Sequence, residues 1–496
     1  NGICTIENVP NISDVKKSCE ILEGLGAKIK WNKQNELTID TRNITETNAS
    51  EELTSKFRAS YYILGSMLGR KGKISVGMPG GCKLGARPID QHIKGFEALG
   101  AKVDVGQGKI MASADKLIGT SIYMDVVSVG ATINVMLSAV LAEGTTIIDN
   151  AAKEPHIVDV ANFLNTMGAD IRGAGTDVIK INGVKKLAGN GTYSIVPDQI
   201  EAGTFMLAAV ATKGDILIKN CITKHLEAIT AKILEIGGHV DDFGDEIRVW
   251  CNERPSKAII KTQPYPGFPT DLQPQMGVVL SVSNGTSRII ENIWESRFQY
   301  TDELNKMGAK ITAQGKNAFF EGVKKLYGAP VYSSDLRAGA ALVIAGTASE
   351  GITEIYNLEH IDRGYENIEE KFVFHPEWAE KGDEELIEIA HSGGGDAAEA
   401  VDLLLERYKD LVRIKTRPYF LLGADRADLI QEGMIGLYKA IIAYQPSKDV
   451  AFKSFADLCI TRQIMTAIKN AARMKHWPLN SYVSLNRTIN DDEEKE

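Results

Sequence analysis

A short glycine-rich loop contains a cysteine that is followed by two basic residues. Residues 79–88 read PGGCKLGARP. Glycines on both sides of the cysteine allow backbone to approach a ligand closely. The positive charges of Lys83 and Arg87 favour the thiolate form of Cys82. The loop therefore predicts a reactive cysteine, and an ordinary glycine turn with a surface cysteine is the equal alternative.

Five arginines and one aspartate stand in distinctive short phrases. The arginines are Arg58, Arg87, Arg297, Arg337 and Arg363. The planar fork of arginine matches carboxylate and phosphate, so convergent arginines indicate a small polyanionic substrate. For any one of them, a scattered surface arginine is the commoner case. Asp271 follows a turn and is placed to act as a base, although a helix N-cap is the more usual role.

The composition narrows the class of protein. The six cysteines lie far apart without a C-x-x-C pair, which suits a reducing cytoplasm better than a disulfide framework or a zinc site. No apolar run is long enough to span a bilayer. The net charge of −9 argues against a protein that is basic throughout. We therefore expect a cytoplasmic protein with no membrane partner, no metal and no cofactor.

The elements that must position these side chains come from an internal repeat. A phrase in which a helix ends at glycine and a strand follows recurs about every 70 residues. Its first glycines are Gly26, Gly100, Gly168, Gly237 and Gly308. Glycine just past a helix end is the expected left-handed cap. We predict five copies of an α/β unit, with no sixth copy near residue 378, where the sequence is aromatic and acidic.

After Lys371 the pattern becomes helical. Apolar residues recur at helical spacing from Val401 to Val412, and a second helix is predicted to open at Asp425. Farther on, residues 451–477 combine aromatic side chains with basic ones, and no acid follows Asp457. Such a helix can neutralise phosphates and stack on unpaired bases. Composition alone favours a solvated basic face with its aromatic residues in the core.

Residues 1 to about 371, through the loop of Cys82, the arginine phrases and Asp271, resemble the UDP-N-acetylglucosamine 1-carboxyvinyltransferases, also called enolpyruvyl transferases. The resemblance implies an inside-out α/β (α+β) barrel of repeated units in two domains, at residues 1–196 and 197–371. It also implies transfer of the enolpyruvyl group from phosphoenolpyruvate to the 3′-hydroxyl of UDP-N-acetylglucosamine with release of phosphate. This reaction is the first step of peptidoglycan precursor synthesis.

The same resemblance assigns roles by position. Cys82 forms the phosphoenolpyruvate adduct, takes part in proton delivery and is alkylated by fosfomycin, while Asp271 receives the proton of the sugar hydroxyl. The phosphoenolpyruvate site comprises Arg58, Arg87, Arg337, Arg363 and Asp335, where Asp335 is paired with the second arginine clamp. The nucleotide sugar is held by Ser128, Val129, Gly130, Glu154, Asp271 and Arg297. Because the related transferase that uses shikimate lacks this loop, Cys82 argues against shikimate as the acceptor.

Several departures from the family pattern affect the expected activity. The family's first strand and a Lys-Asn pair are expected before Asn1, and the closing strand of the sixth unit is replaced near Lys371. Gln199 stands where an arginine is expected, and His156 where an acidic residue is common. We therefore expect a barrel that is incomplete at both ends, with exposed strand edges and little transferase activity.

Residues 384–496 resemble the sporulation and stationary-phase sigma factor sigma-H, and residues 372–383 form the junction. The resemblance implies an all-α domain whose helix with Asp428, Gln431 and Glu432 docks on the RNA polymerase core. The stretch that melts promoter DNA contains Phe455, Arg462, Lys469, Arg473, Lys475 and Trp477. Because a promoter-reading helix-turn-helix is expected only after Glu496, we expect DNA binding without full promoter selectivity.

Three hypotheses remain open from the sequence. The chain is a transferase with an appended module, a transcription module carrying an inactive enzyme, or a junction without biological meaning from a rearranged, mis-assembled or engineered reading frame. The truncation of both halves favours the third as the origin of the chain.

Overall fold

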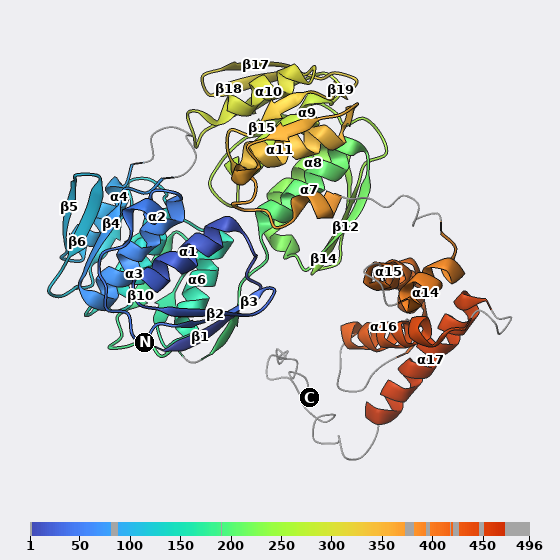
Figure 1. The fold of residues 1–496 in the computed structure, drawn as a ribbon, viewed down its shortest axis with the longest axis horizontal. Coiled ribbons are helices and arrows are strands. Elements are labelled where there is room, and N and C mark those ends of the chain that lie inside the picture. The colour runs from blue at the N-terminus through green and yellow to red at the C-terminus, as the bar shows by residue number, and fades with distance from the viewer. Residues whose placement is uncertain are drawn as a thin grey trace, which may run out of the picture. The chain divides into compact units, whose positions relative to one another are not determined.

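A computed structural model describes residues 2–80, 88–189, 191–372, 381–392, 397–416, 418–419, 426–445 and 451–471. The chain divides into two compact units, Asn1–Ile368 and Glu369–Glu496. The first unit is a mixture of strands and helices, and the second is helical (Figure 1). Each unit is described by itself. None of the described helices is both long and apolar enough to cross a membrane.

The first half of the α/β unit contains three sheets and the helices between their strands. The elements are β1 (Ile3–Glu7), α1 (Ser13–Gly24), β2 (Lys28–Lys33), β3 (Glu36–Asp40), α2 (Glu51–Thr54), η1 (Arg58–Tyr61), α3 (Tyr62–Lys71), β4 (Lys73–Gly77), α4 (Asp90–Ala98), β5 (Lys102–Gly106), β6 (Lys109–Ser113), β7 (Ser121–Tyr123), α5 (Val129–Ala139), β8 (Thr145–Asp149), α6 (Pro155–Thr166), β9 (Asp170–Arg172), β10 (Val178–Asn182) and β11 (Thr192–Ser194). The strand orders are β11-β1-β3-β2, β4-β6-β5 and β7-β8-β10-β9.

The second half repeats the plan. Its elements are α7 (Gln199–Thr212), β12 (Asp215–Lys219), η2 (Thr223–Leu226), α8 (Glu227–Glu235), β13 (His239–Asp242), β14 (Glu246–Trp250), β15 (Ile259–Lys261), η3 (Thr270–Leu272), α9 (Gln273–Ser281), β16 (Thr286–Ile290), η4 (Arg297–Gln299), α10 (Tyr300–Lys306), β17 (Lys310–Gln314), β18 (Asn317–Glu321), β19 (Leu326–Tyr327), β20 (Pro330–Tyr332), α11 (Leu336–Thr347), β21 (Ser349–Glu350), β22 (Glu354–Tyr356), η5 (Leu358–His360) and α12 (Ile368–Phe372). The strand orders are β12-β14-β13, β15-β16-β18-β17, β19-β21 and β20-β22.

The predicted glycine turns are confirmed at all five positions. The backbone φ angles of the five repeat glycines are 105°, 94°, 96°, 93° and 88° in chain order. A side chain is strained at such positive angles, so glycine is the residue that lets each helix turn directly into the next strand. In every copy the following strand forms the outer strand of an antiparallel hairpin, as β9 does with β10.

The central helices are buried on nearly all sides. All residues of α9 are buried, and so are most residues of α5, α7 and α11. A helix that is apolar all round belongs in a core, whereas a surface helix keeps one polar face. The helices α7, α9 and α11 pack pairwise against one another, and α5 packs against α3, α4 and α6. Figure 1 shows α7, α9 and α11 together, next to the strands of the second half. The packing of these helices in the core therefore fixes the positions of their N-terminal ends.

The second unit contains α14 (Asp383–His391), α15 (Ala397–Thr416), α16 (Arg426–Ala443) and α17 (Phe452–Ala471). Leu404, Val412, Leu437, Ile441 and Ile460 belong to one buried apolar cluster. The helices predicted from the apolar spacing are confirmed as α15 and α16. The residue predicted to open the second of them, Asp425, lies outside the described residues, and α16 begins at the next position.

Candidate functional site

The N-terminal ends of several helices line a cleft of about 1330 Å³ in the α/β unit. Its walls include the N-cap residues Ser128 of α5, Glu154 of α6 and Asp198 of α7. Asp271 lies in η3, which directly precedes α9, and Arg337 lies in the first turn of α11. Helix N-termini carry partial positive charge and unpaired N–H groups. The fold therefore directs several anion-attracting ends into a single space.

One wall of the cleft requires a glycine. Ser128 caps α5 by accepting a hydrogen bond from the N–H of Ala131 at 3.3 Å. A Cβ on Gly130 would stand 2.2 Å from Tyr61 Oη and 2.9 Å from His92 Cε1. Any larger residue would therefore displace the Tyr61 and His92 rings. The predicted Ser128, Val129 and Gly130 all line the cleft.

His92 is a neutral hydrogen-bonding group in the same wall. The N–H of Gly65 donates to Asn134 Oδ1 at 2.9 Å, which fixes the orientation of that amide. Asn134 Nδ2 therefore donates to His92 Nδ1 at 2.9 Å, so the ring proton sits on Nε2. Burial, aided by the nearby Arg58, lowers the pKa of His92 to about 4. Arg58 itself lies over the Tyr61 ring at 5.0 Å and lines the cleft.

Glu154 and His156 stand at the start of α6. Within the described part of the chain, Glu154 Oε2 is buried without a hydrogen-bond partner. A buried carboxylate oxygen in a cleft is costly unless a donor reaches it, so it is suited to receive a ligand hydroxyl. His156 also lines the cleft. Loss of hydration lowers its pKa, although the carboxylates of Glu154, Asp198 and Asp271 oppose that shift.

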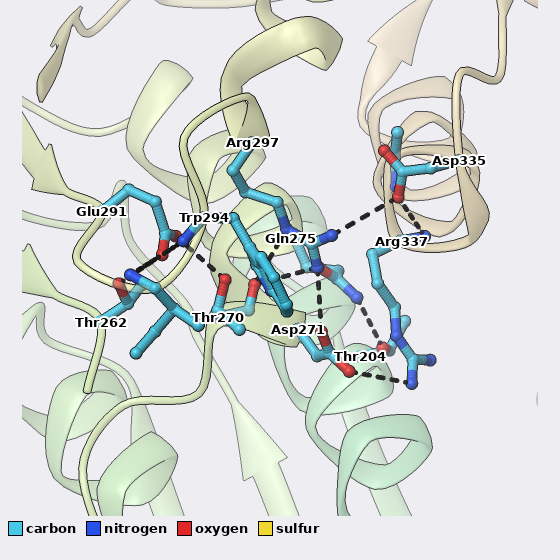
Figure 2. Close-up of polar contacts among 12 residues, drawn as sticks. Thr204, Thr262, Thr270, Asp271, Gln275, Glu291, Trp294, Arg297, Asp335 and Arg337 are labelled. Carbon is cyan, nitrogen blue, oxygen red and sulfur yellow. Dashed lines mark hydrogen bonds and ion pairs between the residues drawn. The ribbon is translucent and has the colours of Figure 1, made fainter. Parts of the chain in front are cut away.

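Asp271 is held by two arginines (Figure 2). Arg297 Nη2 lies 3.1 Å from Asp271 Oδ1, and Arg337 Nη2 lies 3.4 Å from Asp271 Oδ2. Arg297 also donates through Nε and Nη2 to the carbonyl of Thr270, at 3.2 and 3.1 Å. The Asp271 side chain remains 42% exposed, so a substrate in the cleft can reach it. It does not cap a helix through a side-chain bond, which was the alternative from sequence.

Arg297 and Asp335 lie behind this face rather than on it. The Arg297 side chain is 1% exposed and that of Asp335 is 3% exposed, with 3.7 Å between Nη1 and Oδ1. Asp335 Oδ1 also accepts from the backbone N–H of Arg337 and Ala338, at 2.9 and 3.1 Å. Asp335 thus caps α11 and faces Arg297, while its link to the predicted clamp Arg337 is through the backbone.

Arg337 points into the cleft with its side chain 14% exposed. Its Nη1 donates to Tyr365 Oη at 3.2 Å, and its guanidinium lies over the Tyr365 ring at 5.5 Å. Burial opposes the charge of Arg337, but the oxygens of Tyr365, Asp271 and Asp198 raise its pKa. The guanidinium is therefore a permanent cation at the edge of the cleft.

A buried glutamate organises the loops around Asp271, and no local sequence signal marks it. Glu291 is 0% exposed. Its Oε1 accepts from Thr262 Oγ1 at 2.8 Å and from the N–H groups of Ile293 and Trp294 at 2.8 and 3.1 Å. Its Oε2 accepts from Thr270 Oγ1 at 3.0 Å. These bonds join the loop before Asp271 to the loop of Trp294, which lines the cleft (Figure 2).

Among the described residues of the α/β unit, the predicted Arg297, Asp335 and Arg363 do not line this cleft. Arg363 makes a bidentate contact with Asp14 of α1, with Nε and Nη2 at 3.1 and 3.0 Å from the two carboxylate oxygens. Cys82 and Arg87 lie outside the described residues. Of the predicted set, the cleft is lined by Arg58, Ser128, Val129, Gly130, Glu154, Asp271 and Arg337. The sequence reasoning missed Asp198, Glu291, Trp294 and Tyr365.

In the helical unit, one stripe of α16 and one face of α17 are exposed. Side chains at spacings of three and four form the α16 stripe, which consists of Asp428, Gln431, Ile435, Tyr438 and Ile442. Glu432 instead accepts from Gln463 of α17 at 2.8 Å. On α17, Arg462 and Lys469 are exposed, whereas Phe455 packs toward Tyr444 at 5.6 Å between ring centroids. Arg473, Lys475 and Trp477 lie outside the described residues.

Family models match both units. Residues 1–372 match EPSP synthase (3-phosphoshikimate 1-carboxyvinyltransferase), and residues 404–474 match Sigma-70 region 2. A UDP-N-acetylglucosamine 1-carboxyvinyltransferase of Clostridium botulinum is 59% identical over 371 residues, covering 75% of this chain and 89% of that protein. A UDP-N-acetylglucosamine 1-carboxyvinyltransferase 2 of Clostridium acetobutylicum is 57% identical over 371 residues, covering 75% and 88%.

Solved structures share the fold of the α/β unit. The crystal structure of the enolpyruvyl transferase NikO from Streptomyces tendae matches with a TM-score of 0.67 and 23% identity, covering 74% of this chain and 88% of that one. EPSP synthase from Acinetobacter baumannii matches with a TM-score of 0.57 and 18% identity over the same shares. These likenesses confirm the predicted fold class for the first unit.

Proposed function

The chain belongs to the EPSP synthase family through residues 1–372, and on that premise we propose that it transfers the enolpyruvyl group of phosphoenolpyruvate to the 3′-hydroxyl of UDP-N-acetylglucosamine. The relatives at 57–59% identity carry this activity in their names. The observation that carries the proposal is the Asp271 carboxylate, held between Arg297 and Arg337 at the edge of a cleft that helix N-termini line.

Each substrate has chemistry that suits one part of the cleft. The diphosphate of the nucleotide sugar suits the N-terminus of α5, where Ser128, Val129 and Gly130 line the cleft. A sugar hydroxyl suits the unpartnered Glu154 Oε2. The phosphate and carboxylate of phosphoenolpyruvate suit Arg337 and Arg58. Arg87, which lies outside the described residues, is proposed as a further ligand on the strength of the sequence.

The reaction then proceeds by addition and elimination. Asp271 accepts the proton of the 3′-hydroxyl while that oxygen bonds to C2 of phosphoenolpyruvate, and C3 gains a proton that Cys82 is proposed to deliver. The resulting tetrahedral adduct loses a proton from C3 as its bond from C2 to the phosphate oxygen breaks. Phosphate leaves and the vinyl ether is formed. Arg337 stabilises the anionic groups throughout, because its charge does not change during the reaction.

Phosphate release tests this proposal. The full chain is expected to release phosphate from phosphoenolpyruvate only when UDP-N-acetylglucosamine is present. Asp271→Asn is expected to lower kcat by about 10²- to 10⁴-fold, which is the usual contribution of a positioned base. The matched control is Asp302→Asn, at an exposed aspartate of α10. A chain without UDP-N-acetylglucosamine-dependent phosphate release would contradict the proposal and agree with the weak activity expected from sequence.

We also propose that fosfomycin alkylates Cys82, because Lys83 and Arg87 follow this thiol in the sequence and favour its thiolate form. Intact-mass measurement should show one adduct on the full chain and none on Cys82→Ser. The other cysteines with a resolved pKa shift, Cys19, Cys221, Cys251 and Cys459, have it raised chiefly by burial, which disfavours their thiolates. Adducts that persist in Cys82→Ser would contradict this assignment.

A second function is proposed for the helical unit. We infer that residues 404–474 bind the RNA polymerase core through the exposed stripe of α16 and contact promoter DNA through the basic face of α17. The match to Sigma-70 region 2 and the exposure of Ile435 and Tyr438, at 44% and 50%, support this inference. Tyr438→Ser should reduce capture of polymerase core, whereas Tyr327→Ser, at an equally exposed tyrosine of the α/β unit, should not. Equal capture by both variants would contradict it.

A further inference from the structure

A buried tyrosine joins three central helices directly beneath the cleft. Tyr365 is 2% exposed and follows η5. Its Oη lies 2.8 Å from Thr204 Oγ1 of α7, 3.3 Å from Gln275 Nε2 of α9 and 3.2 Å from Arg337 Nη1 of α11. Figure 2 shows Thr204, Gln275 and Arg337 close to Asp271. The tyrosine thus connects the arginine of the cleft to helices from two other repeat units.

The chemistry of the partners fixes the direction of these hydrogen bonds. Arg337 has only donors, so the Tyr365 oxygen must accept from it. Thr204 Oγ1 donates to the carbonyl of Ile200 at 2.7 Å, because a carbonyl only accepts. The Thr204 oxygen is therefore left to accept the phenolic proton of Tyr365. The result is a directed chain from Arg337 through Tyr365 and Thr204 to the backbone of α7.

This series of hydrogen bonds matters because Asp271, the other residue that holds Arg337, changes its protonation during the proposed reaction. The guanidinium is held by Tyr365 at Nη1 and by Asp271 at Nη2. When Asp271 accepts the sugar proton, it loses its charge and its attraction for Arg337 weakens. Burial raises the pKa of Tyr365, so its phenol stays protonated, and the bond to Arg337 does not depend on the state of Asp271. Tyr365 is thus the anchor that remains constant.

We propose that Tyr365 is a positioning residue that holds the Arg337 guanidinium toward the phosphoenolpyruvate end of the cleft through the Arg337–Tyr365–Thr204 chain. The inference rests on the proposed transferase function. A long arginine side chain loses rotamer freedom when it binds an anion. An arginine that is already fixed by the tyrosine loses less on binding, which favours both substrate affinity and the geometry of the transition state.

The test is Tyr365→Phe in the full chain, which keeps the ring beneath the guanidinium and removes only the hydroxyl. We expect kcat/KM for phosphoenolpyruvate to fall about tenfold, equivalent to about 1.4 kcal/mol, while KM for UDP-N-acetylglucosamine changes less than about twofold. The matched control is Tyr356→Phe, because the Tyr356 hydroxyl is exposed and donates to Glu354 Oε2 at 2.9 Å, away from the cleft. That variant should behave as the parent chain does.

A second pair of variants covers the possibility that Tyr365→Phe unfolds. Thr204→Val removes the acceptor of the phenolic proton, whereas Thr204→Ser keeps it. Only the valine variant should show the phosphoenolpyruvate defect. An equal loss for both substrates in Tyr365→Phe, no loss at all, or the same behaviour of both Thr204 variants would overturn the inference. If the parent chain releases no phosphate, the proposed function fails instead. In that case the inference is tested by calorimetric titration of the parent chain and Tyr365→Phe with phosphoenolpyruvate. A weaker affinity of Tyr365→Phe supports the inference, and an unchanged affinity overturns it.

Discussion

Replacing the buried Arg297 by lysine should damage both the stability and the activity of the α/β unit. The side chain is 1% exposed and faces two carboxylates and one carbonyl. Lysine keeps the charge but has no planar fork, so it cannot reach the Thr270 carbonyl and both aspartates together. Arg297→Lys therefore tests whether this arginine positions Asp271 through its geometry rather than through its charge alone.

The expected loss of unfolding free energy depends on the hydrogen bonds and ion pairs that Asp335 and Asp271 keep in the variant. Removing one charged partner of a buried ion pair altogether typically costs about 3–5 kcal/mol, which is an upper range for lysine because it keeps the charge and loses only the fork. Asp335 keeps two backbone donors, and Asp271 keeps Arg337 and is 42% exposed. The loss is therefore placed at the lower end, about 3 kcal/mol. With an unfolding entropy of about 2.1 cal/mol/K per residue over the first unit, this corresponds to a fall in Tm of about 4 °C.

Scanning calorimetry and phosphate release are the assays. The matched control is Arg248→Lys, because Arg248 makes a close bidentate contact with Asp215 while both side chains are 49% exposed. An exposed pair contributes little, so this control should change unfolding by less than about 1 kcal/mol. For Arg297→Lys we also expect kcat to fall at least about tenfold. Wild-type kcat with a Tm like that of the control would refute the reasoning.

Three further predictions concern pH, the adjacent loops and DNA. The pKa of His92 falls from 6.5 to about 4 on folding. The stability that depends on a neutral His92 is therefore fully present above pH 6.5 and is lost as the pH falls toward 4. Between pH 7 and 5 the parent should lose about 2 kcal/mol more unfolding free energy than His92→Gln in urea titrations, and equal losses would contradict this. Glu291→Gln should lower kcat by about tenfold or more, because one of its two buried oxygens no longer accepts; unchanged kinetics beside Glu321→Gln, at an exposed strand position, would count against it. Arg462→Ala and Lys469→Ala should each reduce the salt dependence of single-stranded DNA binding by about 0.7 in log–log slope, and an unchanged slope would remove that side chain from the DNA surface.

Local chemistry accounts for the parts of the fold that the sequence predicted. A glycine after a helix is required wherever the chain turns at positive φ, so Gly26, Gly100 and the three that follow could be read as helix ends. The apolar spacing in residues 401–412 likewise identified α15, because burial of one helical face leaves a period in the sequence. Both signals act over a few residues.

The composition of the cleft depends on pairings across the whole chain. From the sequence, all five arginines were equally good candidates for binding an anionic substrate. In the structure Arg297 is buried behind Asp271, and Arg363 pairs with Asp14, 349 positions away. Nothing in the neighbouring residues distinguishes these outcomes. Glu291 and Tyr365 were missed for the same reason, since a buried carboxylate or phenol is recognised only by the donors and acceptors that surround it.

The position of Arg337 is itself an argument for an anionic ligand. Corresponding positions in the first turns of α5 and α6 hold the uncharged residues Gly130 and His156, the latter with a lowered pKa. A cation at a helix N-terminus is disfavoured by roughly 0.3–1 kcal/mol, because it faces the positive end of the dipole. Arg337 nevertheless occupies the first turn of α11, and Asp271 and Tyr365 are placed to offset that cost. A fold selected for stability alone has no need of this arrangement. An anion that binds both the arginine and the helix N-termini benefits from it directly, so the electrostatic cost supports the proposal that Arg337 binds an anionic ligand.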